Sequence, residues 1–215
     1  TAFEREKQGA PVDPESCEWP EEYFGEEIWF AAWPTGLKLR MMALDPSKGA
    51  SSRHGDFSAY VLLGITPDGT LLVEGDLARR PTPRMVADGV ALYRRFDPAL
   101  FGVEVNQWQE LLADEFAAEF QRQGLLGARP CGVRNYANKL VRIRRLGPYL
   151  SQRKIKFLGD SPSTRVLVDQ LRDFPNGAHD DGPDALEMAL RLAEEAWNGR
   201  SPATDGLGNR LIDSP

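Results

Sequence analysis

The stretch Leu39-Arg40-Met41-Met42-Ala43-Leu44-Asp45, followed by Pro46-Ser47-Lys48-Gly49, organises the interpretation of the whole chain. Its run of apolar residues is typical of a buried strand, and the proline directly after Asp45 stops the ladder of backbone hydrogen bonds. The Asp45 carboxylate is therefore expected at the rim of a sheet. An Asp before a proline is also a common turn residue, so a purely structural role for Asp45 stays open here.

Two further groups of acids occupy comparable places. Phe101-Gly102-Val103-Glu104-Val105 has the pattern of a second buried strand, interrupted by an acid. Burying an unpartnered carboxylate is costly, so Glu104 is expected either to bind a metal ion or to join an ion pair. His179-Asp180-Asp181-Gly182-Pro183-Asp184 opens a late helix. Its three acids can face one point, because Asp184 lies one helical turn after Asp180 and Asp181. Capping by Asp181 or Gly182 is the alternative role for this stretch.

The order of the remaining patterns predicts an α/β fold with a mixed sheet. Strands at 39–45, 57–65 and 71–76 form an antiparallel meander. A helix follows from Pro83 to Phe96, with Thr82 as its cap. A strand over 100–105 then lies parallel to an earlier strand through a crossover. Short strands are expected at 130–133 and 155–158. Further helices begin near Trp108, after caps at Asn138 and Ser161, and at Pro183. Helices cover both faces of this sheet, and Glu104 lies beside Asp45 at one edge.

Two helices carry specific expectations about burial. The helix after Asn138 is expected to bury one apolar side and to turn its arginines to the other. That apolar side comprises Leu140, Val141, Ile143 and Leu146. The buried stripe of the last helix comprises Leu186, Leu190, Ala193 and Trp197.

Length and composition suit one soluble domain. The 215 residues are enough for a substantial core, and no stretch approaches the roughly 20 apolar residues of a membrane span. Cys17 and Cys131 lack metal-ligand spacing and form no disulfide framework. We expect an acidic and aromatic connecting segment over 1–36, a globular domain over 37–198 and a flexible tail over 199–215. The connecting segment is expected to pack on this domain or on a neighbouring one.

Charge is unevenly distributed along the chain. The formal net charge is −6, yet residues 121–159 contain no acid and carry ten bases. A basic stripe on an acidic protein can mark the binding place of a polyanion, although a solvated helix face has the same pattern. The ten bases are Arg122, Arg129, Arg134, Lys139, Arg142, Arg144, Arg145, Arg153, Lys154 and Lys156.

Carboxylates from separate elements that meet at one rim suit hard divalent cations. Mg²⁺ and Mn²⁺ prefer carboxylate and water oxygens, and two such ions about 4 Å apart clamp the attacking and leaving oxygens of a phosphoryl displacement. The expected metal ligands are Asp45, Glu104, Asp180, Asp181 and Asp184, with Asp45, Glu104 and Asp181 as the catalytic set. Asp56 and His179 are expected at the margin of the site. Lys48 lacks the glycine pattern of a nucleotide-binding loop.

Together and in this order, the motifs around Asp45, Glu104 and Asp180 to Leu186 resemble the C-terminal nuclease domain of the large terminase subunit of tailed bacteriophages, from about Trp29 to Trp197. The resemblance implies an RNase H-like fold and a metal-dependent endonuclease. Such an enzyme cuts concatemeric viral double-stranded DNA during packaging, largely without sequence preference, with two Mg²⁺ or Mn²⁺ ions. Asp45, Glu104 and either Asp180 or Asp181 match the metal ligands of that family.

The resemblance also implies partners and a DNA-facing segment. The partners are double-stranded DNA, a packaging ATPase domain, the small terminase subunit and the portal protein, in the cytoplasm of a bacterial host and without a membrane. The residues expected to contact DNA phosphates are Arg134, Lys139, Arg142, Arg144, Arg145, Arg153 and Lys154. No phosphate-binding loop of a packaging ATPase is present, so an excised domain and a stand-alone nuclease both remain possible. A junction-resolvase or transposase-like nuclease, and a non-catalytic docking module of a packaging motor, are the alternative functions.

Overall fold

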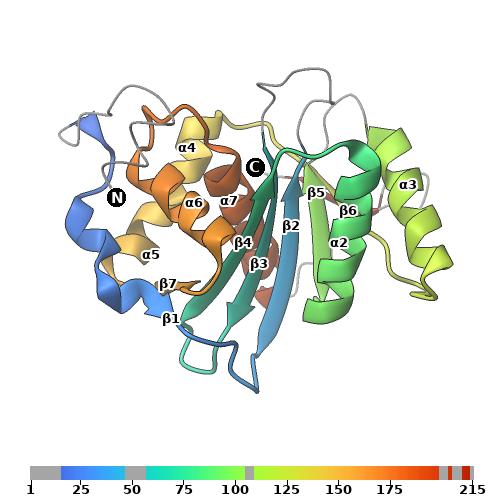
Figure 1. Ribbon diagram of the computed structural model, residues 1–215, viewed down its shortest axis with the longest axis horizontal. Coiled ribbons are helices and arrows are strands. Elements are labelled where there is room, and N and C mark those ends of the chain that lie inside the picture. Colours follow the sequence, from blue (N-terminus) through green and yellow to red (C-terminus); the bar gives the residue numbers. More distant parts are fainter. Residues whose placement is uncertain (1–15, 47–56, 105–108, 199–202, 205–209, 214–215) are drawn as a thin grey trace.

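The computed structural model describes residues 16–46, 57–104, 109–198, 203–204 and 210–213 (Figure 1). Its strands form one mixed sheet in the order β1-β7-β4-β3-β2-β5-β6-β9-β8. They are β1 (Trp29–Phe30), β2 (Leu39–Asp45), β3 (Ser58–Ile65), β4 (Leu71–Ala78), β5 (Leu100–Glu104), β6 (Cys131–Arg134), β7 (Ile155–Leu158), β8 (Ala203–Thr204) and β9 (Arg210–Asp213). The α-helices are α2 (Thr82–Phe96), α3 (Gln109–Arg122), α4 (Lys139–Ile143), α5 (Gly147–Ser151), α6 (Pro162–Arg172) and α7 (Asp181–Trp197). The 3₁₀ helices are η2 (Glu21–Phe24), η3 (Glu26–Ile28) and η4 (Arg144–Leu146).

The centre of the sheet confirms the expected strand pairing. β2, β3 and β4 form an antiparallel meander, and β5 lies parallel to β2 with Leu44 opposite Val103. The crossover through α2 returns the chain to the starting edge of β2, as a connection to a parallel strand must. Consequently β2 and β5 end at the same edge of the sheet. Asp45 is the last residue of β2, and Glu104 is the last residue of β5.

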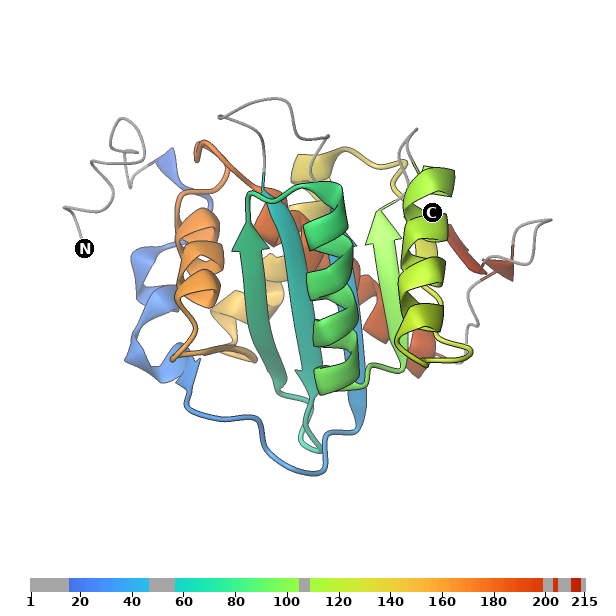
Figure 2. The same cartoon turned by 45° about the vertical axis from the view of Figure 1, so that its right-hand side comes forward.

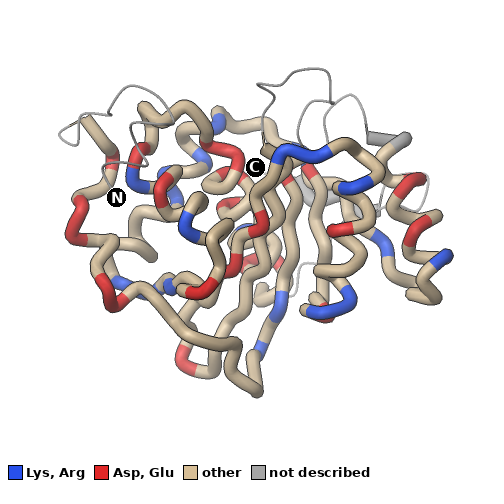
Figure 3. The backbone as a smooth tube through the Cα atoms, in the orientation of Figure 1, with Lys and Arg blue, Asp and Glu red and all other residues tan. Residues whose placement is uncertain are grey.

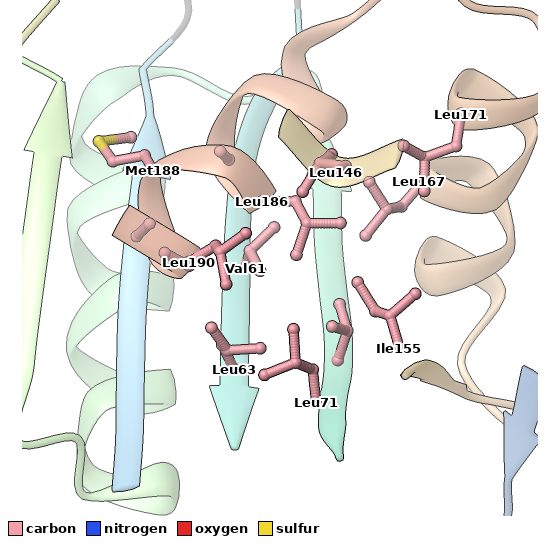
Figure 4. Close-up of a cluster of buried hydrophobic side chains, with 14 of the residues drawn as sticks. Val61, Leu63, Leu71, Leu146, Ile155, Leu167, Leu171, Leu186, Met188 and Leu190 are labelled. Carbon is pink, nitrogen blue, oxygen red and sulfur yellow. The ribbon is translucent and has the colours of Figure 1, made fainter. Parts of the chain in front are cut away.

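Helices cover both faces of the sheet because side chains alternate along each strand. Met42 and Leu44 of β2 pack on the side of α2 and α3, whereas Met41 and Ala43 pack on the side of α6 and α7. Figure 2 shows α2 and α3 on the near side of the sheet and α7 behind it. Figure 4 shows the core on the side of α6 and α7, where Leu186 and Leu190 of α7 lie against Val61 and other apolar side chains of the sheet.

α7 packs close to β5 because Gly102 has no side chain. A Cβ atom at Gly102 would lie 2.6 Å from Cδ1 of Leu192 on α7 and 2.9 Å from Cγ2 of Val133 on β6. Any larger residue would push these elements apart. The close approach places the start of α7 near the edge where β2 and β5 end.

The expected burial of two helices is wrong in part. In α4, Arg142 is 3% exposed whereas Val141 is 55% exposed, because Arg142 faces acids of α7. Trp197, expected in the buried stripe of the last helix, is 65% exposed. The buried part of α7 is not a stripe: residues 181–193 are all buried. α7 contacts β2, β3 and β5 on one side and α4 and α6 on others, so it is covered nearly all round.

The segment before β2 packs on this same domain. Trp19 stacks on Phe174 at 5.1 Å between ring centroids, and β1 pairs in parallel with β7. At the other end of the chain, β9 pairs in parallel with β6. Among the described helices, none has the length and apolar character needed to cross a membrane.

Candidate metal centre at the sheet edge

Three carboxylates from three elements meet at the edge where β2 and β5 end. Asp45 comes from β2, Glu104 from β5 and Asp184 from the first turn of α7. One ligand oxygen from each lies within 4.8 Å of the others. Asp45 is 7% exposed and Asp184 is 2% exposed. We refer to Asp45, Glu104 and Asp184 as the acid cluster.

Crowding of like charges makes the acid cluster a strong site for a cation. Burial raises the pKa of Asp45 well above its usual value, and repulsion from Glu104 and Asp184 raises that pKa further. Burial also raises the pKa of Asp184, against the opposing charges of Lys139 and Arg142. A divalent cation would relieve this repulsion, and an all-carboxylate donor set is the kind that Mg²⁺ and Mn²⁺ prefer. The residues present therefore fit the expected ions.

The ammonium group of Lys139 lies among the same carboxylates. Its Nζ atom is 2.8 Å from Oδ1 of Asp180, 3.4 Å from Oδ2 of Asp184 and 3.9 Å from Oδ2 of Asp45. Burial lowers the pKa of Lys139, but attraction to Asp184, Asp180 and Asp45 outweighs it, so the pKa is raised overall. The cap predicted at Asn138 fixes this lysine, because the Asn138 side chain accepts a hydrogen bond from the Leu140 N–H at the start of α4.

Asp181 lies near the acid cluster but is not one of its three members. Its Oδ2 atom accepts a hydrogen bond of 3.3 Å from the backbone N–H of Phe57, and Nδ1 of His179 is 3.8 Å away. The His179 ring packs edge-on against Phe57, and its Nε2 atom is 3.1 Å from Nη2 of Arg79. His179 therefore lies at the margin of the site, next to Asp181. Asp56 and Lys48 lie outside the described residues.

The cap expected for the last helix is wrong. α7 begins at Asp181, so Asp180 takes the cap position, and the Asp180 side chain makes no capping hydrogen bond. Pro183 fits the third helical position as well as the first, because the first four N–H groups of a helix have no partner within the helix. The Asp180 side chain instead forms an ion pair with Lys139.

A buried network beneath the acid cluster was not predicted. Both amino groups of the Arg142 guanidinium bind Asp184, at 2.5 and 3.1 Å, and Nη1 also lies 3.3 Å from Glu187. The Glu187 carboxylate is 3.9 Å from Nε of Arg191 one turn further along α7. The signal in the sequence that could have revealed this network is Glu187 and Arg191 within the otherwise apolar stretch 185–193, one turn and two turns after Asp184.

On the other side of the acid cluster, Asn135 contacts Glu104. The Nδ2 group of Asn135 donates a hydrogen bond of 2.8 Å to Oε1 of Glu104. Oδ1 of Asn135 accepts a hydrogen bond of 2.6 Å from Arg191. No periodicity or motif in the sequence marks Asn135, because it follows β6 in a connecting segment.

The structure divides the basic span. Arg134 ends β6 and is exposed, whereas Arg142 is buried and held by Asp184. Arg153 and Lys154 precede β7, and Arg153 pairs with Glu27. Ile155 lies opposite Leu71 at the start of β4, and β4 runs in the same direction as β2. Arg153 and Lys154 therefore lie at the opposite edge of the sheet, roughly 20 Å from the acid cluster at about 3.3 Å per strand residue.

Two other arginines reach the edge with the acids. Arg79 follows β4, and Arg84 lies in the first turn of α2. Figure 3 shows basic residues where β4 leads into α2. Arg79 also lies 4.6 Å above the Phe57 ring. Sequence reasoning missed both, although Arg79, Arg80 and Arg84 lie within six positions of the sequence.

The comparisons with known proteins agree on the fold. The model of a family described as terminase RNase H-like domain matches residues 42–193. The large terminase of bacteriophage HK97 is similar in structure, with a TM-score of 0.60 and 15% identity over 81% of this chain and 43% of that chain. The present chain thus spans less than half of that terminase. No curated protein matches the chain in sequence.

Two isolated nuclease domains are similar over nearly their full length. A human cytomegalovirus terminase nuclease domain soaked with manganese gives a TM-score of 0.52 at 12% identity, over 80% of this chain and 92% of that one. A mutant nuclease domain of the large terminase subunit of bacterial virus Sf6, with manganese and beta-thujaplicinol, gives a TM-score of 0.51 at 10% identity. That match covers 79% of this chain and 92% of the other. The expected RNase H-like fold is confirmed.

Proposed function

This chain belongs to the terminase RNase H-like domain family, and on that basis we propose that it is a metal-dependent endonuclease that cuts viral double-stranded DNA during genome packaging. The observation that carries the proposal is the acid cluster, in which Asp45, Glu104 and Asp184 bring carboxylate oxygens within 4.8 Å of one another. The two structurally similar terminase nuclease domains that hold manganese support Mg²⁺ or Mn²⁺ as the cofactor.

The acid cluster would hold two ions, with Asp180 and Asp181 as further ligands at its margin. Bound there, the ions would supply an activated water and stabilise the leaving oxygen of the phosphodiester. The residues of this chain hold and orient the site. Arg142 donates hydrogen bonds to both oxygens of Asp184. In the metal-free protein, the ammonium group of Lys139 partly neutralises the negative charge of Asp45, Asp180 and Asp184.

We assign DNA contact to the exposed and half-buried bases on the acid-bearing side of the protein. From the predicted set these are Arg134, Lys139, Arg144 and Arg145. Arg142 is excluded because it is buried, and Arg153 and Lys154 are excluded because they lie at the opposite edge. Contacts to phosphates carry no sequence information, so we expect cutting that is largely independent of sequence. The packaging ATPase domain, the small terminase subunit and the portal protein, in the bacterial cytoplasm, are the proposed partners and setting.

Plasmid nicking and linearisation with Mg²⁺, Mn²⁺ or EDTA tests the proposal. The wild-type chain should cut with either metal and not in EDTA, and Asp45→Asn and Asp184→Asn should fall to the EDTA background. Asp97→Asn is the matched control, because Asp97 is an exposed acid that pairs with Arg40 at the starting edge of β2. No cutting with any metal, or cutting by Asp45→Asn at the wild-type rate, would overturn the proposal and favour a docking module.

A further inference from the structure

Glu104 is tied to α7 through Asn135. Asn135 follows β6 and lies between two charged groups, the Glu104 carboxylate at 2.8 Å and the Arg191 guanidinium at 2.6 Å. Arg191 is itself buried and is held by Glu187 and by the backbone carbonyl of Arg134, at 3.9 and 3.5 Å. The chain of contacts therefore runs from a buried arginine on α7, through one amide, to a member of the acid cluster.

The chemistry of the two neighbours fixes the direction of the amide. A guanidinium only donates hydrogen bonds, so Arg191 requires the amide oxygen of Asn135. The amide nitrogen must then face Glu104, which as an ionised carboxylate only accepts. Each neighbour thus reinforces the same orientation. The Asn135 side chain meets both requirements at once, because its amide carries a donor for Glu104 and an acceptor for Arg191.

We propose that Asn135 is a positioning residue that holds the Glu104 carboxylate toward Asp45 and Asp184 for metal binding. The inference rests on the proposed metal site. α7 then positions two members of the acid cluster: it carries Asp184 itself and orients Glu104 through Arg191 and Asn135. Hydrogen-bond partners of metal ligands typically contribute about 10- to 100-fold to metal affinity.

Calorimetric titration of the DNA-free chain with Mn²⁺ tests this role. Asn135→Ala should weaken Mn²⁺ binding by about 10-fold or more. The same substitution in a Glu104→Ala background should cause no further loss, because its effect passes through Glu104. An equal loss in both backgrounds would mean that Asn135 acts through the fold, which would overturn the proposal.

Two additional variants secure the result. Asn176→Ala, which removes a side chain that bonds Ser16, should bind Mn²⁺ like the wild type. Asn135→Ser keeps a polar group but cannot bridge both partners, and it should behave like Asn135→Ala. Thermal unfolding in EDTA should show both Asn135 variants folded. If both Asn135 variants bound Mn²⁺ with the wild-type affinity, only the role of Asn135 would be overturned. If the wild-type chain bound no Mn²⁺, the proposed function itself would be overturned.

Discussion

Asp184 belongs both to the acid cluster and to the buried network beneath it. One of its carboxylate oxygens lies within 4.8 Å of an oxygen of Asp45 and of Glu104, yet both of its oxygens accept hydrogen bonds from Arg142. Burial raises the pKa of Asp184, and the positive charges of Lys139 and Arg142 oppose that shift. A carboxylate binds a metal ion in its deprotonated form, so this opposition would favour metal binding at the proposed site.

Replacing Arg142 by methionine should destabilise the protein strongly. Buried Asp184 would lose both hydrogen bonds from Arg142 and buried Glu187 would lose one, and breaking such a buried pair costs about 3–5 kcal/mol. Urea unfolding in EDTA measures the change in the free energy of unfolding. Arg144→Met is the control, since Arg144 pairs with Glu18 at the surface and such a pair contributes about 0–1 kcal/mol. Equal losses for the two variants would contradict this account of Arg142.

At the scale of elements, the turn of the β3–β4 hairpin sets the register between these two strands. It places Ile65 opposite Leu71, and the same register places Ala59 opposite Leu77 at the other edge, where Ala59 also lies opposite Asp45 of β2. Asp68 at the tip accepts hydrogen bonds from the hydroxyls of Thr66 and Thr70, at 2.5 and 2.7 Å. These hydrogen bonds lower the pKa of Asp68 to about 2, and the bond from Thr66 has the larger effect.

The stabilising effect of Asp68 should depend on pH. A pKa lower in the folded state than the unfolded value of about 3.9 stabilises the fold above the unfolded pKa, and the effect is lost as pH falls from about 4 to about 2. Asp68→Asn should therefore be less stable than the wild type at pH 7, and the difference should shrink across that range. Urea unfolding at several pH values measures it. Thr70→Val should flatten the same dependence, and a pH-independent difference would refute this explanation.

At the scale of the molecule, the two edges of the sheet differ in chemistry. The edge where β2 and β5 end carries the acid cluster together with Lys139 and Arg134. At the opposite edge, Arg153 pairs with Glu27 of the N-terminal segment, so acids from 1–36 neutralise part of the basic span. The basic span is continuous in sequence but does not form one surface in the fold.

DNA binding should distinguish the two edges. Arg134→Ala should weaken binding of a random-sequence duplex in EDTA and lower the slope of log affinity against log salt by about 1, as loss of one phosphate contact does. Lys154→Ala should change neither quantity, because Lys154 lies at the far edge. Fluorescence anisotropy across a range of KCl concentrations measures both. Similar losses for Arg134→Ala and Lys154→Ala would show that DNA does not favour the acid-bearing edge.

The sequence alone determined the elements and two members of the acid cluster. β2 and β7 have the predicted bounds, and the expected caps at Asn138 and Ser161 are present, whereas the cap expected at Thr82 is wrong because α2 begins at Thr82 and Pro81 takes the cap position. These features depend on local rules of periodicity, proline placement and capping. The side-by-side placement of Asp45 and Glu104 followed from the expectation that the strand after the crossover lies beside β2 and parallel to it.

Only the tertiary structure decided which acid of α7 completes the acid cluster and which bases face it. Asp180, Asp181 and Asp184 are equivalent by spacing, and the rotation of α7 against β2 and β5 brings Asp184 to the other two acids. The same packing buried Arg142 and connected Asn135 to Glu104 and Arg191. These contacts join residues more than thirty positions apart, where local patterns carry no information and the energy of burial and pairing decides the arrangement.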